Sequence, residues 1–511
     1  MADTWPSSSV SLPIVALLIW IAYIFGLAIY RVYLSPIANF PGPKLAALTY
    51  WYEFYHEVIL RGQYTFRIND WHDKYGPIIR VTPDELHIRD SDHWDELYGN
   101  NPKADKYERF AIKFGNNSSM FTTSNAALHR IRRAALSPMF SKRQITNLLP
   151  VIQQKVDLVC SRLSEYVETG EVLAISNIWA AFAADVITEY AFSLCYDQLK
   201  SPGCAENFRD AFLAMSEFGH LAVQFPWIMK VVKSLPDSIS ERMNPPLSRI
   251  LKFQRDLRVM LSRIASGDSQ RPKNSGHPTI FEEVLRSNLP RQEKSFHRLG
   301  EEAQLVVGAA VMTTAGAMSI ASFHIIDQPR IYEKLREELR EAFSDPSAPI
   351  GLLQLERLPY LRGCVQEGIR LSYGLSSRQP RISDTPTRYK DWVIPAHAPV
   401  GMNIIDVHHD EELYPDSHSF IPERWLGNPK APNGSPLDRY FVAFGKGPRS
   451  CLGINMAYAE LYLGLGTVFR RFAFELYETD VTDVELAHDF TLPSPRLDSK
   501  GVRVRVKPFD I

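Results

Sequence analysis

The stretch Phe444-Gly-Lys-Gly-Pro-Arg-Ser-Cys-Leu-Gly453 decides the fold of this 511-residue chain, and an apolar, helix-like run from Asn455 to Phe472 follows it. Unpaired amide N–H groups at a helix start, together with the positive end of the helix dipole, stabilise a thiolate at Cys451. Gly447 allows a tight turn and a close approach to a flat ligand. Arg449 supplies a guanidinium, which matches a carboxylate in shape and charge. This spacing favours a ligand-binding thiolate over a glycine-rich loop with a buried free cysteine.

The five fixed positions of this stretch match the pattern F-x-x-G-x-R-x-C-x-G, so the chain resembles the cytochrome P450 family of haem-thiolate enzymes. The resemblance covers residues 40–505 and implies one large domain, mainly α-helical with small β-sheets. It implies that Cys451 is the axial ligand of the iron of haem b and that Arg449 pairs with a haem propionate. Gly447 would approach the porphyrin, and Phe444 would pack beside the sulfur and limit the access of water.

The composition indicates a large globular protein. The chain is 45% hydrophobic and 23% charged, with a formal net charge of −1. The sequence contains no basic run of the kind that indicates nucleic-acid binding. The five cysteines are odd in number and include no C-x-x-C pair, so neither a disulfide framework nor a zinc site is predicted. Length alone would suggest two or more domains, whereas the resemblance implies one.

The N-terminus carries an uncharged apolar run, Ile14 to Tyr30, long enough for a helix of about 25 Å. No positive charge precedes it and no small-residue cleavage site follows it, which favours an anchor over a cleaved signal peptide. Arg31 and Lys44 place the body of the protein in the cytosol. We therefore expect a lumenal segment at 1–12, a transmembrane signal-anchor helix at 13–31, a Pro/Gly hinge at 32–43 and a catalytic domain at 44–511, with the protein in the endoplasmic reticulum membrane.

Apolar periodicity and turn residues outline the rest of the chain. A helix is predicted from Tyr64 to Tyr75, followed by two short strands, Ile78 to Val81 and Glu85 to Ile88. Further helical patterns cover residues 144–195, 206–218, 246–264 and 292–340, and residues 266–279 are predicted to be a surface loop.

Two short motifs lie between these helices and the cysteine. Glu367 and Arg370 form an E-x-x-R, whose spacing puts both side chains on one helical face. Alone, such a pair is usually a solvated salt bridge. The run Phe420-Ile-Pro-Glu-Arg-Trp425 follows it, and the family resemblance implies that Arg424 joins Glu367 and Arg370 in a buried structural triad.

A basic run, His129-Arg-Ile-Arg-Arg133, reads either as a solvated helix face or, by the resemblance, as the helix that grips the haem propionates. The family often has tryptophan where His129 stands, but His129 and Arg133 can both donate hydrogen bonds to a carboxylate. Arg381, after Gln379-Pro380, is a third propionate candidate.

The stretch Gly308-Ala-Ala-Val-Met-Thr-Thr314 resembles the family's oxygen-activating helix, with the pattern [A/G]-G-x-[D/E]-T-T. Thr313 is the catalytic candidate, because a hydroxyl there can relay protons. Met312 replaces the usual acid and Ala310 the second glycine. One interpretation is that water or another side chain supplies protons to an ordinary monooxygenase. The other is atypical chemistry, such as desaturation, oxidative coupling or rearrangement.

The resemblance to fungal secondary-metabolism members, the trichodiene oxygenase-like group among them, implies hydroxylation or another oxidation of a lipophilic substrate, a terpenoid or related polycyclic compound. No flavin or nicotinamide motif is present, so NADPH-cytochrome P450 reductase would supply electrons, with cytochrome b5 as a further donor. We expect a monomer that binds no nucleic acid. Rival functions are an isomerase or dehydratase that needs no O2 and a non-catalytic haem sensor. The candidate pocket residues are Phe110, Phe114, Met120, Phe121, Phe218, Ala309 and Leu375.

Overall fold

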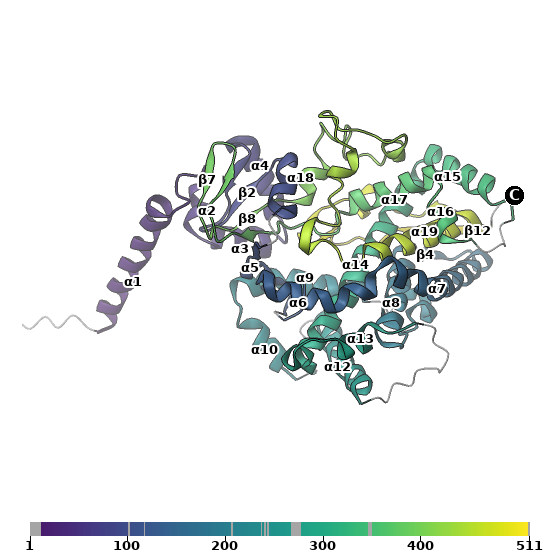
Figure 1. Cartoon of the computed structure of the whole chain (residues 1–511), viewed down its shortest axis with the longest axis horizontal. Coiled ribbons are helices and arrows are strands. Elements are labelled where there is room, and N and C mark those ends of the chain that lie inside the picture. Colours follow the sequence, from purple (N-terminus) through teal and green to yellow (C-terminus); the bar gives the residue numbers. More distant parts are fainter. Residues whose placement is uncertain are drawn as a thin grey trace, which may run out of the picture.

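The computed structural model describes residues 12–100, 103–116, 118–205, 208–236, 238–239, 242, 245–266, 277–345 and 350–508. It is mainly helical, with small sheets at both ends of the body (Figure 1). The helices are α1 (Leu12–Ile29), α2 (Lys44–Leu48), α3 (Trp51–Phe54), α4 (Tyr64–Tyr75), α5 (Glu108–Ala111), α6 (Ala126–Leu136), α7 (Lys142–Thr169), α8 (Ile175–Phe192), α9 (Arg209–Gln224), α10 (Ile228–Ser234), α12 (Pro245–Ala265), α13 (Ile280–Arg286), α14 (Phe296–Asp327), α15 (Pro329–Ala342), α16 (Leu352–Leu355), α17 (Pro359–Ser372), α18 (Ile404–His408) and α19 (Ile454–Arg471).

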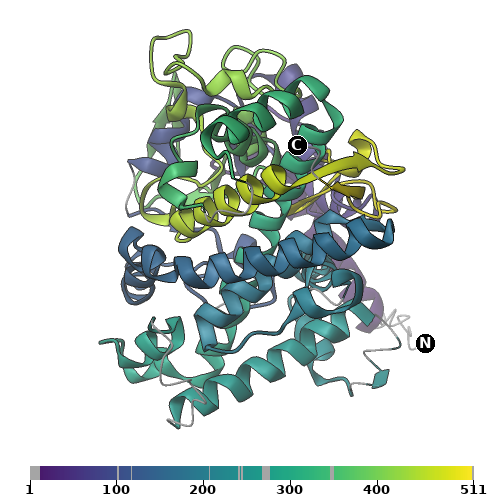
Figure 2. The same cartoon turned by 90° about the vertical axis from the view of Figure 1, so that its right-hand side faces the viewer.

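The core is built around the long helix α14, which packs against α8, α17 and α19. Helix α8 is apolar on nearly every face, and such a helix must be buried on all sides. Its Trp179 is fully buried, and the indole donates to the Ser322 hydroxyl of α14 at 3.0 Å. Helix α19, which follows the cysteine stretch, runs beside the long helix α7 (Figure 2). The cysteine stretch is therefore attached directly to the core.

The predicted helical patterns agree with the structure, and two of them contain more than one helix. The pattern over 144–195 forms α7 and α8, because Gly170, in the left-handed region at φ +67°, ends α7, and strand β4 (Val172–Ala174) separates the two helices. The pattern over 292–340 divides at Gln328, whose position before Pro329 disfavours helical backbone. Of the surface loop predicted at 266–279, residues 267–276 lie outside the described residues.

The strands form four small sheets. They are β1 (Ile78–Arg80), β2 (Leu86–Ile88), β3 (Asp105–Lys106), β4 (Val172–Ala174), β5 (Arg381–Ile382), β6 (Thr387–Tyr389), β7 (Trp392–Ile394), β8 (Val400–Gly401), β9 (Phe472–Leu476), β10 (His488–Phe490), β11 (Leu492–Ser494) and β12 (Arg503–Pro508). The largest sheet has the order β1-β2-β8-β5-β3, and β1 with β2 is the predicted N-terminal pair. The antiparallel register of β3 and β5 places Lys106 directly opposite Arg381.

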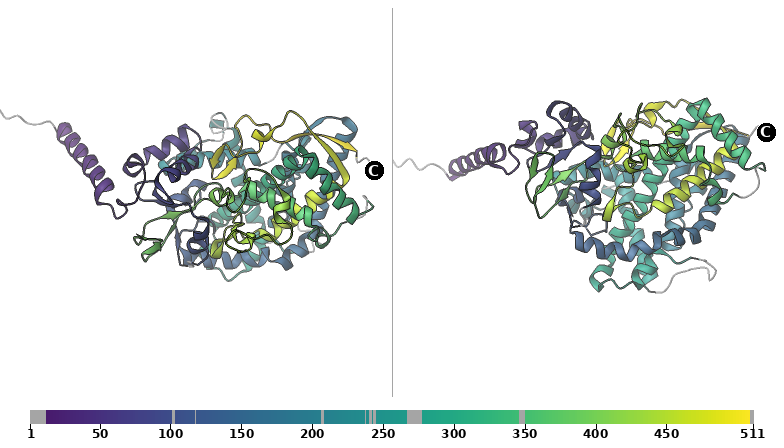
Figure 3. Two further views of the ribbon diagram at one scale, coloured as in Figure 1. Left: turned by 90° about the horizontal axis from the view of Figure 1, so that it is seen from above. Right: turned by 45° about the horizontal axis from the view of Figure 1, so that its top comes forward.

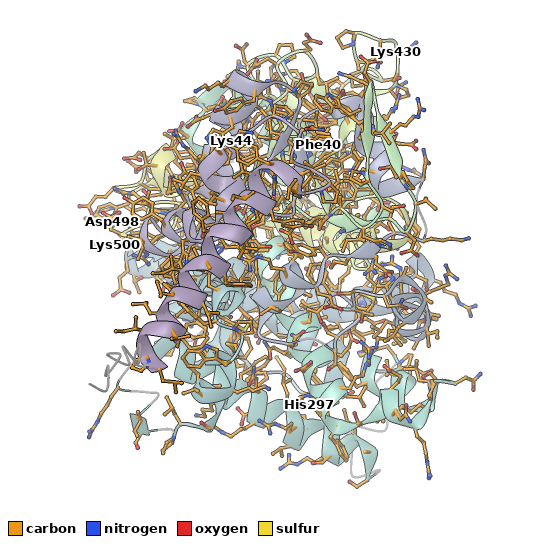
Figure 4. The ribbon with its side chains drawn as sticks, turned by 90° about the vertical axis from the view of Figure 1, so that its left-hand side faces the viewer. Phe40, Lys44, His297, Lys430, Asp498 and Lys500 are labelled. Atoms are coloured by element: carbon orange, nitrogen blue, oxygen red, sulfur yellow. The ribbon has the colours of Figure 1, made fainter. Side chains whose placement is uncertain are left out.

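Helix α1 projects away from the body in the views of Figures 1 and 3. With the turn Tyr30–Leu34 it forms a 23-residue apolar segment of mean hydropathy 2.5, none of it buried. Helix α14 is also long and apolar enough to cross a membrane, but half of its apolar window is buried in the core. At the base of α1, Arg31 donates to the Leu48 carbonyl at 2.8 Å, and Phe40 and Lys44 lie close by (Figure 4).

Gly363 fixes how closely α17 approaches the turn Pro422–Trp425, since a Cβ there would lie 2.5 Å from the Pro422 carbonyl oxygen. We predict that Gly363→Ala lowers the free energy of unfolding by about 1–3 kcal/mol, because backbone must shift to make room. Urea unfolding followed by circular dichroism measures this. Gly316→Ala on α14 is the matched control: its Cβ would meet nothing within 4 Å, and alanine favours helix by up to about 1 kcal/mol. Equal midpoints for the two variants would contradict the prediction.

Candidate active site

The cysteine loop, residues 444–453, presents Cys451 to a large internal cavity. The Cys451 amide donates to the Phe444 carbonyl at 2.7 Å and closes the loop, and Arg133 of α6 donates to the Ser450 carbonyl at 2.8 Å. Gly453 is the N-cap of α19, so the sulfur does lie at a helix start. Even so, burial raises the pKa of the Cys451 thiol, and this effect outweighs the Gly453 amide and Arg133, which lower it.

Gly447 has a different role from the one that the sequence suggested. It does not line the cavity. It has φ +67°, and a Cβ there would lie 2.3 Å from the carbonyl oxygen of Tyr98. The turn at Gly447 therefore packs against the backbone of the helical turn Asp95–Gly99, and its glycine is required by that contact.

Glu367, Arg370 and Arg424 form a buried network behind the loop. Arg370 Nε donates to one Glu367 oxygen, and Arg424 Nε donates to the other at 2.9 Å. Arg370 also donates to three backbone carbonyls, those of His408, Ser417 and Ser419. Glu367 and Arg370 are fully buried.

His408 connects this network to the cysteine loop. Its Nδ1–H donates to the Arg370 carbonyl at 2.8 Å, and its Nε2 accepts from the Val442 amide at 3.2 Å, two residues before Phe444. Burial lowers the pKa of His408 to about 3, so the ring is neutral and can both donate and accept. A buried carboxylate thus sets the position of the loop through Arg370 and His408.

Helix α14 supplies one wall of the cavity. Ala309, Ala310, Met312 and Thr313 all line it, and the Thr313 hydroxyl donates to the Ala309 carbonyl at 2.9 Å, one turn back along the helix. Other lining residues are mostly apolar: Phe114, Met120, Phe121, Phe140, Phe212, Met215, Leu305, Ile369, Leu375, Ile404, Phe444, Leu452, Met456, Leu461 and Leu492.

Two of the pocket candidates do not line the cavity, Phe110 and Phe218. Phe110 is buried elsewhere, in contact with the rings of Phe114 and Phe121. Helix α9 lines the cavity with Phe212, Met215 and Ser216. Phe218, on the same helix, is not among the residues that line the cavity.

Basic side chains line the cavity together: Lys106, His129, Arg133, Arg381 and Arg449. Lys106 and Arg381 are paired across β3 and β5, and like charges opposite each other destabilise a sheet. Burial lowers the pKa of Lys106 well below its usual value, and Arg381 and Arg449 lower it further. Burial lowers the pKa of His129 to about 3, and the nearby positive charges of Arg449, Lys106, Arg133 and Arg381 act in the same direction. Such a cluster is suited to a ligand with two negative charges.

Comparison with known proteins identifies the family. The family model for cytochrome P450 matches residues 41–500. The chain is 48% identical to cytochrome P450 monooxygenase sdnE of Sordaria araneosa, with 96% of each chain covered. It is 41% identical to tryptophan 6-hydroxylase fscE of Fusarium equiseti (99% of this chain, 100% of the relative) and 38% identical to N-acetyltryptophan 6-hydroxylase ivoC of Emericella nidulans (96% of each). The chain belongs to the cytochrome P450 family and is a monooxygenase, and the family uses haem b on a cysteine thiolate.

The residues present fit this cofactor. The Cys451 sulfur faces the cavity, and a Cβ built on Gly453, which lines the same wall, would meet no atom within 4 Å. The basic cluster has the charge and the hydrogen-bond donors to pair with the two carboxylates of haem. Arg449 donates to the carbonyls of Thr123 and Ser124 at 2.7 and 2.6 Å, which fixes its side chain within the cluster.

Sequence reasoning missed two residues of this site. Lys106 gives no local signal, because only the β3–β5 register brings it beside Arg381. Glu460 lies on α19 inside an otherwise apolar run, lines the cavity and is 1% exposed. Burial raises the pKa of Glu460 well above its usual value, against a smaller lowering by a side-chain hydrogen bond with Thr314. Burial therefore favours the protonated form of this acid in the cavity wall.

We predict that Lys106→Met weakens haem binding about tenfold or more, because a charged hydrogen bond to a propionate contributes about 1.5–3 kcal/mol. The measurement is the rate of haem transfer from the purified protein to an excess of apomyoglobin. Lys103→Met, three residues earlier and exposed, is the matched control and should behave as the wild type does. Equal transfer rates for both variants would show that Lys106 does not hold the cofactor.

Proposed function

We propose that this chain is a membrane-anchored monooxygenase that oxidises a lipophilic secondary metabolite, a terpenoid or related polycyclic compound, with O2 and electrons supplied from NADPH by a reductase. The observation that carries the proposal is the exposure of the Cys451 sulfur in a mainly apolar cavity that Thr313 also lines.

Each part of the site has a proposed role. Cys451 would bind the haem iron, while Arg133, His129, Arg381, Arg449 and Lys106 would hold the propionates. When bound, the haem supplies the activation of O2 and the transfer of oxygen to the substrate. The chain's own task is to exclude water, to orient the substrate and to deliver protons; Thr313 would relay them through its hydroxyl.

The lining supports a neutral, lipophilic substrate. Two carboxyl residues line the cavity, Glu302 and Glu460. Glu302 is already paired with Arg298 and accepts from the Met120 amide at 3.0 Å. The basic residues of the lining belong to the proposed propionate cluster, which the cofactor would occupy. A zwitterionic substrate would therefore bury its two charges in this wall without charged partners. The two tryptophan hydroxylases among the relatives make an indole substrate the alternative, in its neutral form.

Glu460 is the proposed source of protons in place of the acid that Met312 replaces. Burial favours the protonated form of its carboxyl, and the Thr314 side chain of α14 lies within hydrogen-bond reach of it. Glu302 stands 11 residues before Thr313, about 16 Å along the helix, which is too far for direct transfer. This assignment supports an ordinary monooxygenase; atypical chemistry at Met312 is the alternative.

The N-terminal segment supports anchoring in a membrane. Residues 13–31 are proposed to span the bilayer of the endoplasmic reticulum, with 1–12 lumenal, 32–43 as a hinge and 44–511 as the cytosolic catalytic domain. NADPH-cytochrome P450 reductase, with cytochrome b5 as a further donor, would dock on the cytosolic body of a monomer.

The function is tested by turnover. Microsomes that contain the protein and its reductase are incubated with O2, with and without NADPH, and with the metabolite that accumulates when the gene is deleted. Product that requires NADPH and O2 and contains an atom from ¹⁸O2 supports the proposal. Product without NADPH would instead indicate an isomerase or dehydratase, and an oxidised product without ¹⁸O would indicate desaturation or coupling.

Cys451→His is predicted to abolish the long-wavelength absorption of the reduced carbon monoxide complex that a thiolate ligand produces, because imidazole donates less electron density to iron. Cys364→Ser, at a buried cysteine outside the cavity wall, is the matched control and should keep the band. If the band survives in Cys451→His, the ligand assignment is wrong.

Glu460→Gln is predicted to lower product formation per NADPH at least tenfold and to increase peroxide release, because the amide cannot give up a proton.

A second readout is independent of turnover. A carboxyl whose pKa is raised in the folded state stabilises the fold less as pH rises above about 4.5, its value in the unfolded chain. The stability of Glu460→Gln relative to wild type should therefore rise with pH, as measured by urea unfolding at several pH values. Met312→Glu in the Glu460→Gln background should restore coupling. If coupling is unchanged in Glu460→Gln, another group supplies the protons.

A further inference from the structure

A group of buried ionisable side chains lies outside the cavity wall and has no role in the proposed chemistry. Its four members come from four separate segments: Glu57 of the turn Tyr55–Ile59, Lys113 of the turn Ile112–Phe114, His220 of α9 and Asp489 of β10. The group therefore joins parts of the chain that are far apart in the sequence.

This group lies where α9 meets the turn Ile112–Phe114. A Cβ on Gly219 of α9 would lie 2.1 Å from the Lys113 carbonyl oxygen, so the two backbones are in direct contact. Helix α9 lines the cavity as far as Ser216, one turn before His220, and the last residue of the turn lines it as well. A rearrangement of the buried group would therefore move part of the cavity wall.

The surroundings of the His220 ring require a proton between two groups. Nε2 lies 2.8 Å from the Asp489 carbonyl, which can only accept, so Nε2 carries a hydrogen. Nδ1 faces Glu57 Oε1 at 3.6 Å, and neither Nδ1 nor the Glu57 oxygens have a hydrogen-bond partner among the described residues. A bare nitrogen opposite an ionised carboxylate would place two acceptors face to face. A proton on either group removes this opposition.

Lys113 offers Glu57 incomplete compensation. Its Nζ lies 3.9 Å from Glu57 Oε1 and 3.4 Å from the Ser377 hydroxyl, which donates to the Asp489 carboxylate at 2.8 Å. One ammonium group is therefore shared between two buried acids.

The other charged or titratable groups around this site are engaged elsewhere: Glu53, Glu85, Arg109, Arg378 and Tyr64. Both arginines pair with Glu53, and Arg378 also pairs with Glu85. The Tyr64 hydroxyl donates to the Val81 carbonyl.

We propose that the proton between Glu57 and His220 is a latch: while it is present α9 stays against the turn Ile112–Phe114, and its loss at alkaline pH loosens α9 and speeds the entry of ligands into the cavity. Ionisation would leave a buried, poorly compensated carboxylate, which costs free energy until α9 moves and water enters. Burial raises the pKa of Glu57 and lowers the pKa of His220, so the proton resides on the Glu57 carboxyl.

The direction of the pH effect follows from this assignment. The carboxyl binds its proton more tightly in the closed state than in an open, hydrated state, where its pKa is near the ordinary value of about 4.5. As pH rises above that value, the open state gains by up to about tenfold per pH unit, until the carboxyl is ionised in both states.

Hydrogen exchange of the purified holoprotein, followed by mass spectrometry between about pH 6.5 and pH 9, measures the opening of α9. After correction for the intrinsic exchange rate at each pH, the amides of α9 should exchange about tenfold faster or more at the upper end, while those of α8 stay unchanged. The rate at which an N-aryl triazole, a neutral ligand of haem iron, changes the absorption spectrum should rise over the same range.

Glu57→Gln keeps a neutral side chain of the same shape opposite His220, so both readouts should become independent of pH. Lys113→Met removes the cation that favours ionised Glu57, so the rise should move to higher pH. Glu217→Gln is the matched control, because Glu217 also joins α9 to the N-terminal part, by a surface ion pair with Arg61 at 2.7 Å. This variant should follow the wild type.

Exchange of α9 that is independent of pH in the wild type, or that rises equally in Glu57→Gln, would overturn the inference. A rise that keeps its position in Lys113→Met would do the same, and this decision does not require Glu57→Gln to fold. Absence of any spectral change with the triazole would contradict the haem assignment, while the exchange measurement would still decide the inference.

Discussion

The buried carboxylate of Glu367 is the constraint on which the active site depends. A buried charge without partners costs several kcal/mol, so Glu367 must keep both Arg370 and Arg424. Arg370 in turn donates its remaining N–H groups to the carbonyl of His408, the last residue of α18, and to carbonyls that follow that helix. His408 connects the network to Val442. A loop with almost no regular secondary structure thus acquires one conformation. The position of the Cys451 sulfur follows from an ion network that contains no catalytic group.

A second electrostatic constraint acts inside the cavity. The sheet register pairs Lys106 with Arg381, and Arg133 and Arg449 lie in the same basic cluster beside the His129 ring, whose pKa is lowered to about 3. Like charges this close destabilise the folded protein unless an anion binds between them. If the cluster holds the haem propionates as proposed, its stability is coupled to the cofactor.

The polar groups of the apolar wall bear on how protons would reach the site. The Thr313 hydroxyl donates to the Ala309 carbonyl of its own helix, and burial favours the protonated form of Glu460 beside Thr314. The replacement of an acid by Met312 is therefore a local loss on α14, while a buried acid from another helix lies in the same wall. Proton delivery would then depend on two helices, α14 and α19.

The sequence by itself determined the features that short spacings encode. The cysteine stretch, the E-x-x-R pair and the apolar runs identified the family, the mainly helical fold and the candidates Cys451, Thr313, Arg449 and Arg370, because a helix turn or a tight loop brings such residues together locally. Only the tertiary structure decided the rest. Gly447 serves a contact with Tyr98, Phe218 lies outside the cavity wall, Lys106 meets Arg381 across a sheet, and Glu460 is buried in the cavity wall beside Thr314. Each of these depends on residues far apart in the chain, whose desolvation and pairing exist only once the core has packed.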